Sequence, residues 1–196
     1  LGAQTVISVA PDGTLIAYSP QTSTVYRVDA ATSDVVADRW TTGLGRGSTY
    51  QTTSVGGRWA VLDVGSRTLQ LEGRAVDLSR FIPAGADPVL QQPGPASDRV
   101  LVATDRGLVS VPLDGGGAPA LMVSDRVGTP AAPLVLGGCV YAAWSSGQGW
   151  RRCAGESAAS LRLPGMAGSA ALSFLVNTRQ VVLNDARGGA SWAVQH

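Results

Sequence analysis

The sequence predicts an all-β protein of the β-propeller class, with about five four-stranded blades of about 40 residues each. Similar apolar strands recur directly after Gly13, Gly57, Asp98, Gly138 and Arg179, at spacings of 44, 41, 40 and 41 residues. The 25 glycines and 11 prolines interrupt every apolar run, so no long helix is expected. A sheet of this size cannot bury both of its faces alone, and stacked neighbouring sheets would cover them.

Within each unit the strands can be assigned in order. An apolar run and a tight turn precede the repeated strand, and a short loop leads to a third strand. A weaker, more polar fourth run closes the first four units: DVVADRW, AVDLS, PALMVS and SLRLP. Inner runs such as VISVA and APLVL are expected to be buried between neighbours. The expected blades, within a single domain over residues 1–196, are residues 4–41, 48–80, 86–124, 130–164 and 169–196.

Two structural alternatives stay open. A β-sandwich also uses short strands at regular intervals. The last unit lacks a fourth run, and Leu1–Gln4 is short for supplying one, so the ring is expected to be imperfectly closed. An exposed edge there would favour a partner, or further sequence of a longer parent chain.

Because Leu1 is not a methionine, we expect a mature form or a piece excised from a larger protein. Around Leu78–Ala86 only a short helical turn fits before Pro83 and Gly85.

The composition excludes several chemistries. All 15 basic residues are arginines, which excludes lysine Schiff bases and P-loop lysines. The single histidine is the terminal His196, so a Ser-His-Asp triad and most zinc sites are not expected. The net charge is +1 with interspersed signs, so no nucleic-acid partner is expected. No cofactor, no metal and no membrane-spanning segment are expected either.

Cys139 and Cys153 are predicted to form a disulfide. They lie on the second and third strands of the fourth unit, and a hairpin centred on residue 146 places them opposite each other. Such a bond persists in an oxidising compartment, which indicates an extracytoplasmic protein. The alternative is a pair of buried free thiols that face each other.

The same region carries a family resemblance. Residues 138–153 read GCVYAAW, five further residues and WRRC, and LSFLVNTRQVVLNDARGGASWAV follows. Over residues 134–195 this pattern resembles the N-terminal propeller-like region of large actinobacterial envelope proteins that continue into fibronectin type III or immunoglobulin-like repeats. The resemblance implies that Cys139, Cys153, Asn184 and Asp185 recur in the family. It implies a secreted or membrane-anchored parent protein and no known activity.

Carboxylates offer weak candidates for catalysis. A glycoside hydrolase needs two of them about 5 to 10 Å apart around a cleft. The chain has twelve aspartates and two glutamates, Glu72 and Glu156, and most aspartates stand in turn sequences where the side chain caps its own backbone. Asp63 and Asp185 end the second strand of a blade and are the best candidates, with turn capping as the alternative role. No catalytic residue is predicted.

Tryptophan gives the better indication of a binding site. Trp144 and Trp150 flank the loop of the cysteine-bearing hairpin, and Arg151 and Arg152 adjoin Trp150. A sugar-stacking or protein-docking patch is predicted here, with Trp144, Trp150 and Arg151 as its ligand-binding residues. The alternative is that the indoles pack across the hairpin as a cross-strand pair. Trp40, Trp59 and Trp192 are expected to pack between blades.

Two glycine-rich stretches are expected to be connections. The loop Thr42–Ser48 has glycine at every second position, which a phosphate-binding turn can share, but no strand-then-helix context surrounds it. The run Asp114–Gly117 is expected to be a turn.

The sequence therefore predicts an extracytoplasmic, non-catalytic binding or protein-interaction module of a cell-envelope or secreted protein. Its expected partners are cell-wall glycan, another envelope protein or neighbouring domains of the parent chain. A lectin-like domain or glycoside hydrolase is one alternative function, and a structural spacer is the other.

Overall fold

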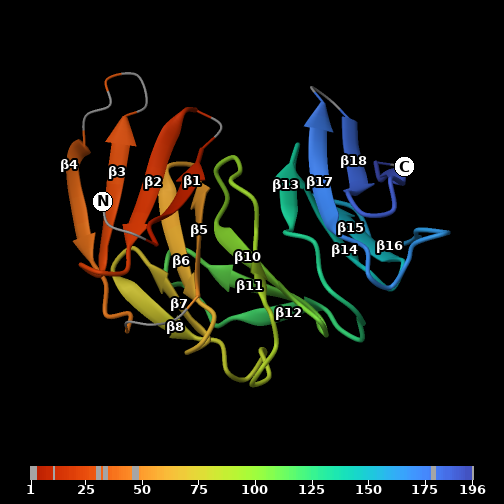
Figure 1. Cartoon of the computed structure of the whole chain (residues 1–196), viewed down its shortest axis with the longest axis horizontal. Helices are drawn as coiled ribbons and strands as arrows, with labels where there is room; N and C mark the ends of the chain where they lie inside the picture. The colour runs from red at the N-terminus through yellow and green to blue at the C-terminus, as the bar shows by residue number, and fades with distance from the viewer. Residues whose placement is uncertain are drawn as a thin grey trace. The chain divides into compact units, whose positions relative to one another are not determined.

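The computed structural model describes residues 4–10, 12–29, 32, 35–45, 49–177 and 180–195. Leu1 and His196 lie outside these ranges. In the described part the chain consists of strands and turns without a helix, and it forms four four-stranded antiparallel sheets and one three-stranded sheet (Figure 1). The predicted all-β, β-propeller fold class is therefore confirmed.

The first two sheets contain eight strands in chain order. The strands of the first sheet are β1 (Val6–Val9), β2 (Thr14–Ser19), β3 (Thr24–Asp29) and β4 (Val35–Thr41). The strands of the second sheet are β5 (Tyr50–Val55), β6 (Arg58–Asp63), β7 (Thr68–Leu71) and β8 (Arg74–Asp77).

The other three sheets keep the same order along the chain. The strands of the third sheet are β9 (Val89–Leu90), β10 (Arg99–Thr104), β11 (Gly107–Pro112) and β12 (Ala120–Val123). The strands of the fourth are β13 (Leu134–Leu136), β14 (Cys139–Trp144), β15 (Gln148–Cys153) and β16 (Ala159–Arg162). The strands of the fifth are β17 (Leu172–Asn177), β18 (Gln180–Asp185) and β19 (Ser191–Ala193).

The chain divides into two compact units. One comprises residues 1–85, 92–100 and 112–117, and the other comprises residues 86–91, 101–111 and 118–196. The first two sheets belong to the first unit and the last two to the second, while β10 and β11 contribute residues to both. The single domain over residues 1–196 and the closure of the ring stay predictions.

Burial follows the position of each strand in its sheet. The middle strand β11 is buried at all six positions, and β6 at all but its first. The outer strands β12 and β16 have only exposed or half-buried positions. The run APLVL, expected to be buried, includes β13, in which Leu134 is buried while Val135 and Leu136 are half-buried.

The run VISVA is an exception. It forms β1, which pairs in its sheet with β2 alone, and Ser8 is buried while Ile7 and Val9 are 56% and 55% exposed. The expected burial of this strand on both faces is therefore wrong. Alternating side chains of an edge strand point to opposite faces, and here the larger apolar ones point to the exposed face.

Aromatic side chains link neighbouring sheets inside each unit. The indoles of Trp40 on β4 and Trp59 on β6 lie 5.6 Å apart between ring centroids, within one apolar cluster. In the second unit, Nε1 of Trp192 on β19 donates to the carbonyl oxygen of Pro164, which follows β16, at 3.1 Å. All three tryptophans thus have the packing role predicted for them.

The segment expected to hold a helical turn forms one. The carbonyl oxygen of Leu78 accepts the N–H groups of Phe81 and Ile82, both at 2.9 Å. Pro83 follows directly and cannot continue the hydrogen-bond pattern.

Candidate functional site

The disulfide hairpin organises the fourth sheet. The register of β14 and β15 places Cys139 directly opposite Cys153, and the two sulfurs are bonded. Their Cα atoms are 3.9 Å apart, and the sequence separation of the two cysteines is 14. The predicted pairing is confirmed, because the short turn after Trp144 leaves these strands in the register that the sequence indicates.

Trp144 and Trp150 lie on one face of this hairpin as a diagonal cross-strand pair, since Trp144 pairs with Gln148 and Trp150 with Ala142. Their side chains are only 0% and 3% exposed, within an apolar cluster that includes Leu101 of β10. Neither indole offers a ring face to a sugar in this structure. This burial corrects the expectation of a stacking patch and agrees with the alternative, in which the indoles pack across the hairpin as a cross-strand pair.

Arg151 is engaged with protein groups. Its Nη1 donates to the carbonyl oxygen of Gln195, and its Nη2 lies 3.8 Å from Oε2 of Glu156. Tyr141 is its register partner on β14. Burial raises the pKa of the Tyr141 phenol, with Arg151 opposing the shift and Glu156 adding to it. Arg151 therefore supports the hairpin from the face opposite the two indoles.

Asp185 is used in the turn between β18 and β19. Its carboxylate is 2% exposed, and its Oδ1 accepts the N–H groups of Ala171 at 2.9 Å and Arg187 at 3.0 Å. Burial alone would raise the pKa of Asp185, but the N–H groups of Ala171, Arg187 and Gly188, with the Arg187 guanidinium, outweigh it and lower the pKa below 3.8. The carboxylate is thus ionised and held by backbone donors, which is the capping role.

Asp63 has the same place in the second sheet. It ends β6, is buried, and accepts the N–H of Ser66 through Oδ1 at 3.1 Å. A carboxylate fixed in this way braces the β6–β7 turn. Asp63 and Asp185, the candidates for acid and base chemistry, therefore both accept backbone N–H groups near the turns that they cap.

A pocket of about 610 Å³ lies in the second unit, at the β14–β15 turn and along β16. Its polar lining comprises Arg126, Ser146, Gln148, Ser160 and Arg162. Leucines of β16 and the segment after it, with Met166, form its apolar side. None of the lining residues that the structure describes is acidic, and a volume of this size suits a small ligand, since such sites span roughly 300–1,000 Å³.

Sequence reasoning did not find this pocket. Arg162 is brought to Gln148 by the β15–β16 register, and Arg126 comes from the connection between β12 and β13. The connection follows the end of β14, because Ala131 donates to the carbonyl oxygen of Ala143 at 2.9 Å. Alternation along a strand places Ser160 and Arg162 on one face of β16, but the sequence carries no signal for the path of the connection.

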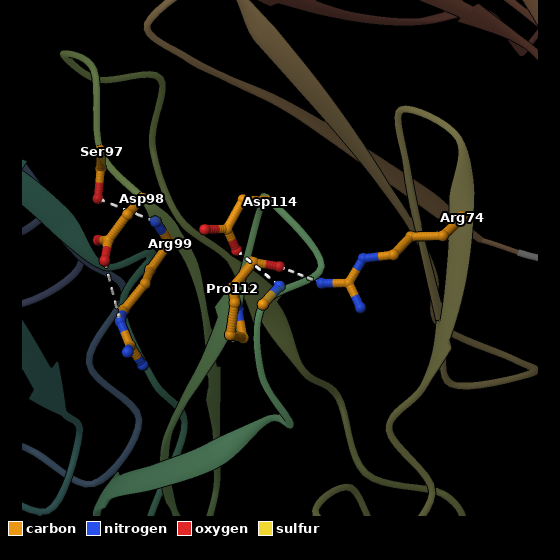
Figure 2. Close-up of polar contacts among 7 residues, drawn as sticks. Arg74, Ser97, Asp98, Arg99, Pro112 and Asp114 are labelled. Atoms are coloured by element: carbon orange, nitrogen blue, oxygen red, sulfur yellow. Dashed lines mark hydrogen bonds and ion pairs between the residues drawn. The ribbon is translucent and has the colours of Figure 1, made fainter.

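Arginines of the second sheet hold the end of β11 and the residue that follows it. Nη2 of Arg74 donates to the carbonyl oxygen of Pro112, and Arg58 donates to the next carbonyl along the chain. Figure 2 shows Arg74 reaching Pro112 beside Asp114, whose Oδ1 accepts the Gly116 N–H at 2.9 Å. This N–H, with smaller contributions from the two arginines, holds the pKa of Asp114 below its usual 3.8. The predicted turn at residues 114–117 is therefore present. Asp114 caps it, and the two arginines hold the carbonyls that precede it.

The glycine-rich loop after β4 is packed where it is described. Leu44 is buried in the first unit's apolar cluster, and Tyr50 donates its hydroxyl to the carbonyl oxygen of Gly45. Residues 46–48 of the predicted loop lie outside the described ranges. In the described portion the backbone carbonyls face a tyrosine and a serine, Ser23, rather than an open anion cradle.

The described residues include no group of three or more His, Cys, Asp or Glu residues placed to hold a metal ion. The same part of the chain includes no helix with the length and hydropathy needed to cross a membrane.

Solved β-propeller structures resemble this chain, while no protein-family model and no curated protein sequence matches it. A catalytically inactive variant of virginiamycin B lyase from Staphylococcus aureus, crystallised with quinupristin, has a TM-score of 0.59 at 14% identity, over 91% of this chain and 61% of the lyase. A chain of the nidogen/laminin complex has a TM-score of 0.59 at 8% identity, and the match covers 97% of this chain and 74% of that chain. PorZ is an essential bacterial surface component of the type-IX secretion system of Porphyromonas gingivalis. Its TM-score is 0.52 at 13% identity, and the match covers 96% of this chain and 27% of PorZ.

These likenesses concern the fold, because fewer than one residue in six is identical. The chain spans about three fifths of the lyase structure and about a quarter of PorZ.

Proposed function

We propose that the chain is a non-catalytic, extracytoplasmic binding module of a cell-envelope or secreted protein. The observation that carries the proposal is the Cys139–Cys153 disulfide between neighbouring strands. Reducing compartments keep thiols free, so a structural disulfide of this kind favours export. The resemblance of residues 134–195 to envelope proteins with fibronectin type III or immunoglobulin-like repeats supports the same compartment.

A non-catalytic role is supported by what the best candidate carboxylates do. Asp63 and Asp185 are buried and bonded to backbone N–H groups of their own turns. A general acid or base must reach a substrate proton within about 3 Å, and these oxygens point into the turns.

A binding role is supported by the pocket on the fourth sheet and by the neighbours in structure. The pocket includes the β14–β15 turn of the hairpin that the disulfide closes. Among the similar structures, the nidogen/laminin complex joins two proteins and PorZ is a bacterial surface component. We infer that this chain likewise recognises a partner outside the cytoplasm, with cell-wall glycan or another envelope protein as the expected partner.

The compartment is tested by the oxidation state of the natural protein. Extracts of the source cells, trapped with a thiol-alkylating reagent before lysis, should contain the chain with both cysteines protected until reductant is added. Complete alkylation without reductant would show two free thiols and remove the argument for export.

The binding role is tested on insoluble cell-wall sacculi, immobilised polysaccharides and an envelope-protein fraction. We expect retention on at least one of these materials without release of soluble saccharides. Release of saccharides would contradict the non-catalytic proposal. Failure to bind any material would favour the structural spacer, in which case joining the chain to its neighbouring domains should raise its stability.

A further inference from the structure

The arginines of the fourth-sheet pocket lack negative partners. Arg126 and Arg162 both line it, and neither forms an ion pair with a carboxylate among the described residues. The nearest acidic residue in sequence, Asp125, accepts the hydroxyl of Ser124 through Oδ2 at 2.8 Å. The pocket therefore has two positive charges that no carboxylate of the described residues pairs with.

Arg126 is held in place by weak contacts. Its Nη2 lies 3.3 Å from Oγ of Ser160, and its guanidinium carbon lies 5.7 Å from the centroid of the Trp144 ring. Its Nε is buried without a hydrogen-bond partner in the described structure. The residue is half-buried and its contact with Ser160 is exposed, so the hydroxyl and the aromatic face are weak partners for a positive charge that no described carboxylate pairs with.

Arg162 supplies the second charge from a defined position. It ends β16 opposite Gln148 in the register, so both side chains project from the same face of the sheet. The Oε1 of Gln148 accepts the Val127 N–H, next to Arg126 in the chain, at 3.3 Å. The amide of Gln148 therefore lies between the segment that carries Arg126 and the strand that carries Arg162.

The remaining lining suits a polyhydroxylated ligand. Hydroxyls of Ser146 and Ser160 and the amide of Gln148 offer donors and acceptors, and apolar residues such as Met166 also line the pocket. We propose that this pocket binds an oxyanion carried on a sugar, the chemistry shared by uronic acids, sugar sulfates and sugar phosphates. The assignment rests on the proposed binding function and names the class of ligand that it takes.

The test measures binding of glucuronate, a sugar sulfate, a sugar phosphate and neutral glucose to the purified chain by titration calorimetry at low salt. We expect at least one charged sugar to bind, and its identity gives the source of the oxyanion. Added salt should weaken the binding because the contact is between charges at a partly open site. Equal binding of glucose, or no binding of any charged sugar, would overturn the proposal.

Arg162→Gln is the main variant, because Arg162 is exposed and its loss leaves the core intact. Removing one charge-assisted contact should weaken the bound sugar about tenfold or more. The matched control is Arg152→Gln, which removes the same charge from an exposed position on β15 outside the pocket. Equal weakening by both variants would mean a general charge effect and would overturn the site.

Arg126→Gln is the second variant, assayed alongside its own unfolding curve because Arg126 packs over Trp144. A folded Arg126→Gln chain should bind the charged sugar at least as weakly as Arg162→Gln does, and unchanged binding would contradict the assignment. If the native chain is retained on sacculi or envelope protein but binds no charged sugar, this inference fails and the proposed function stands. If it is retained on none of the materials, the proposed function fails as well.

Discussion

The indole N–H of Trp144, at the end of β14, donates to the backbone carbonyl oxygen of Thr104, at the end of β10, at 2.7 Å. The indole is fully buried, so no water can replace this acceptor. The bond fixes the fourth sheet to residues of the third within the second unit.

Trp144→Phe should therefore lower the free energy of unfolding by more than the smaller ring volume alone would. The carbonyl oxygen of Thr104 would lose its buried donor, which costs about 1–3 kcal/mol of unfolding free energy. The matched control is Trp59→Phe, because Trp59 is equally buried and its Nε1 has no partner in the described structure. Urea unfolding should give the larger loss for Trp144→Phe. Equal losses would show that the hydrogen bond contributes nothing net.

Reduction of the disulfide should lower the stability of the chain. In the chain-entropy model, closing a loop of about 15 residues with a disulfide raises the free energy of unfolding by about 3 kcal/mol. The double variant Cys139→Ser, Cys153→Ser should lose the same amount in unfolding free energy, and reductant should then have no further effect on it. Intact-mass measurement should show a gain of about 2 Da when the native chain is reduced and unfolded, since about 1 Da is added per thiol hydrogen. An unchanged unfolding curve after complete reduction would contradict the stabilising role.

Gly56→Ala should cost more than Gly57→Ala, although both glycines have positive φ, of 54° and 81°. A side chain in this region costs about 1–2 kcal/mol at either position. At Gly56 an added Cβ would also lie 2.3 Å from Cα of Ala96, where the backbone of Gly94 pairs with the β5 end, while the space around Gly57 is open. Thermal unfolding of the two variants measures the difference. A similar shift in Tm for both would show that the Ala96 segment moves away without cost.

The lowered pKa of Asp185 gives stability a dependence on pH with a definite sign. The unfolded chain takes up a proton near the ordinary value of 3.8, before the folded carboxylate does. The contribution of Asp185 is therefore complete above that value and is lost as pH falls through it towards the lower folded pKa. Urea unfolding of the native chain and of Asp185→Asn should show a stability gap at pH 7 that narrows below about pH 4. A gap that stays constant with pH would contradict the assignment.

Local features were predictable where the chain itself sets the geometry. The turn between β14 and β15 fixes their register, so the pairing of Cys139 with Cys153 followed from spacing alone. Short polar side chains in turn sequences, such as Asp114, cap their own backbone for the same local reason.

The candidate site was less predictable, because burial depends on what lies above each face of a sheet. Alternation placed Trp144 and Trp150 on one face, but that face proved to be the covered one. Arg126 approaches Arg162 through a connection whose path no periodicity describes. Ile7 and Val9 show the converse, since their apolar character did not reveal which face of β1 is exposed.

The disulfide also determines whether the fourth sheet stays in one covalent piece after proteolysis of its hairpin turn. Ser146, in the turn that borders the pocket, is exposed and lies between the bonded cysteines. A cut there would open the backbone but leave the two fragments covalently joined through Cys139 and Cys153, with their strands still paired. The two fragments of a hairpin nicked at this turn would therefore separate only after a reductant had cleaved the disulfide.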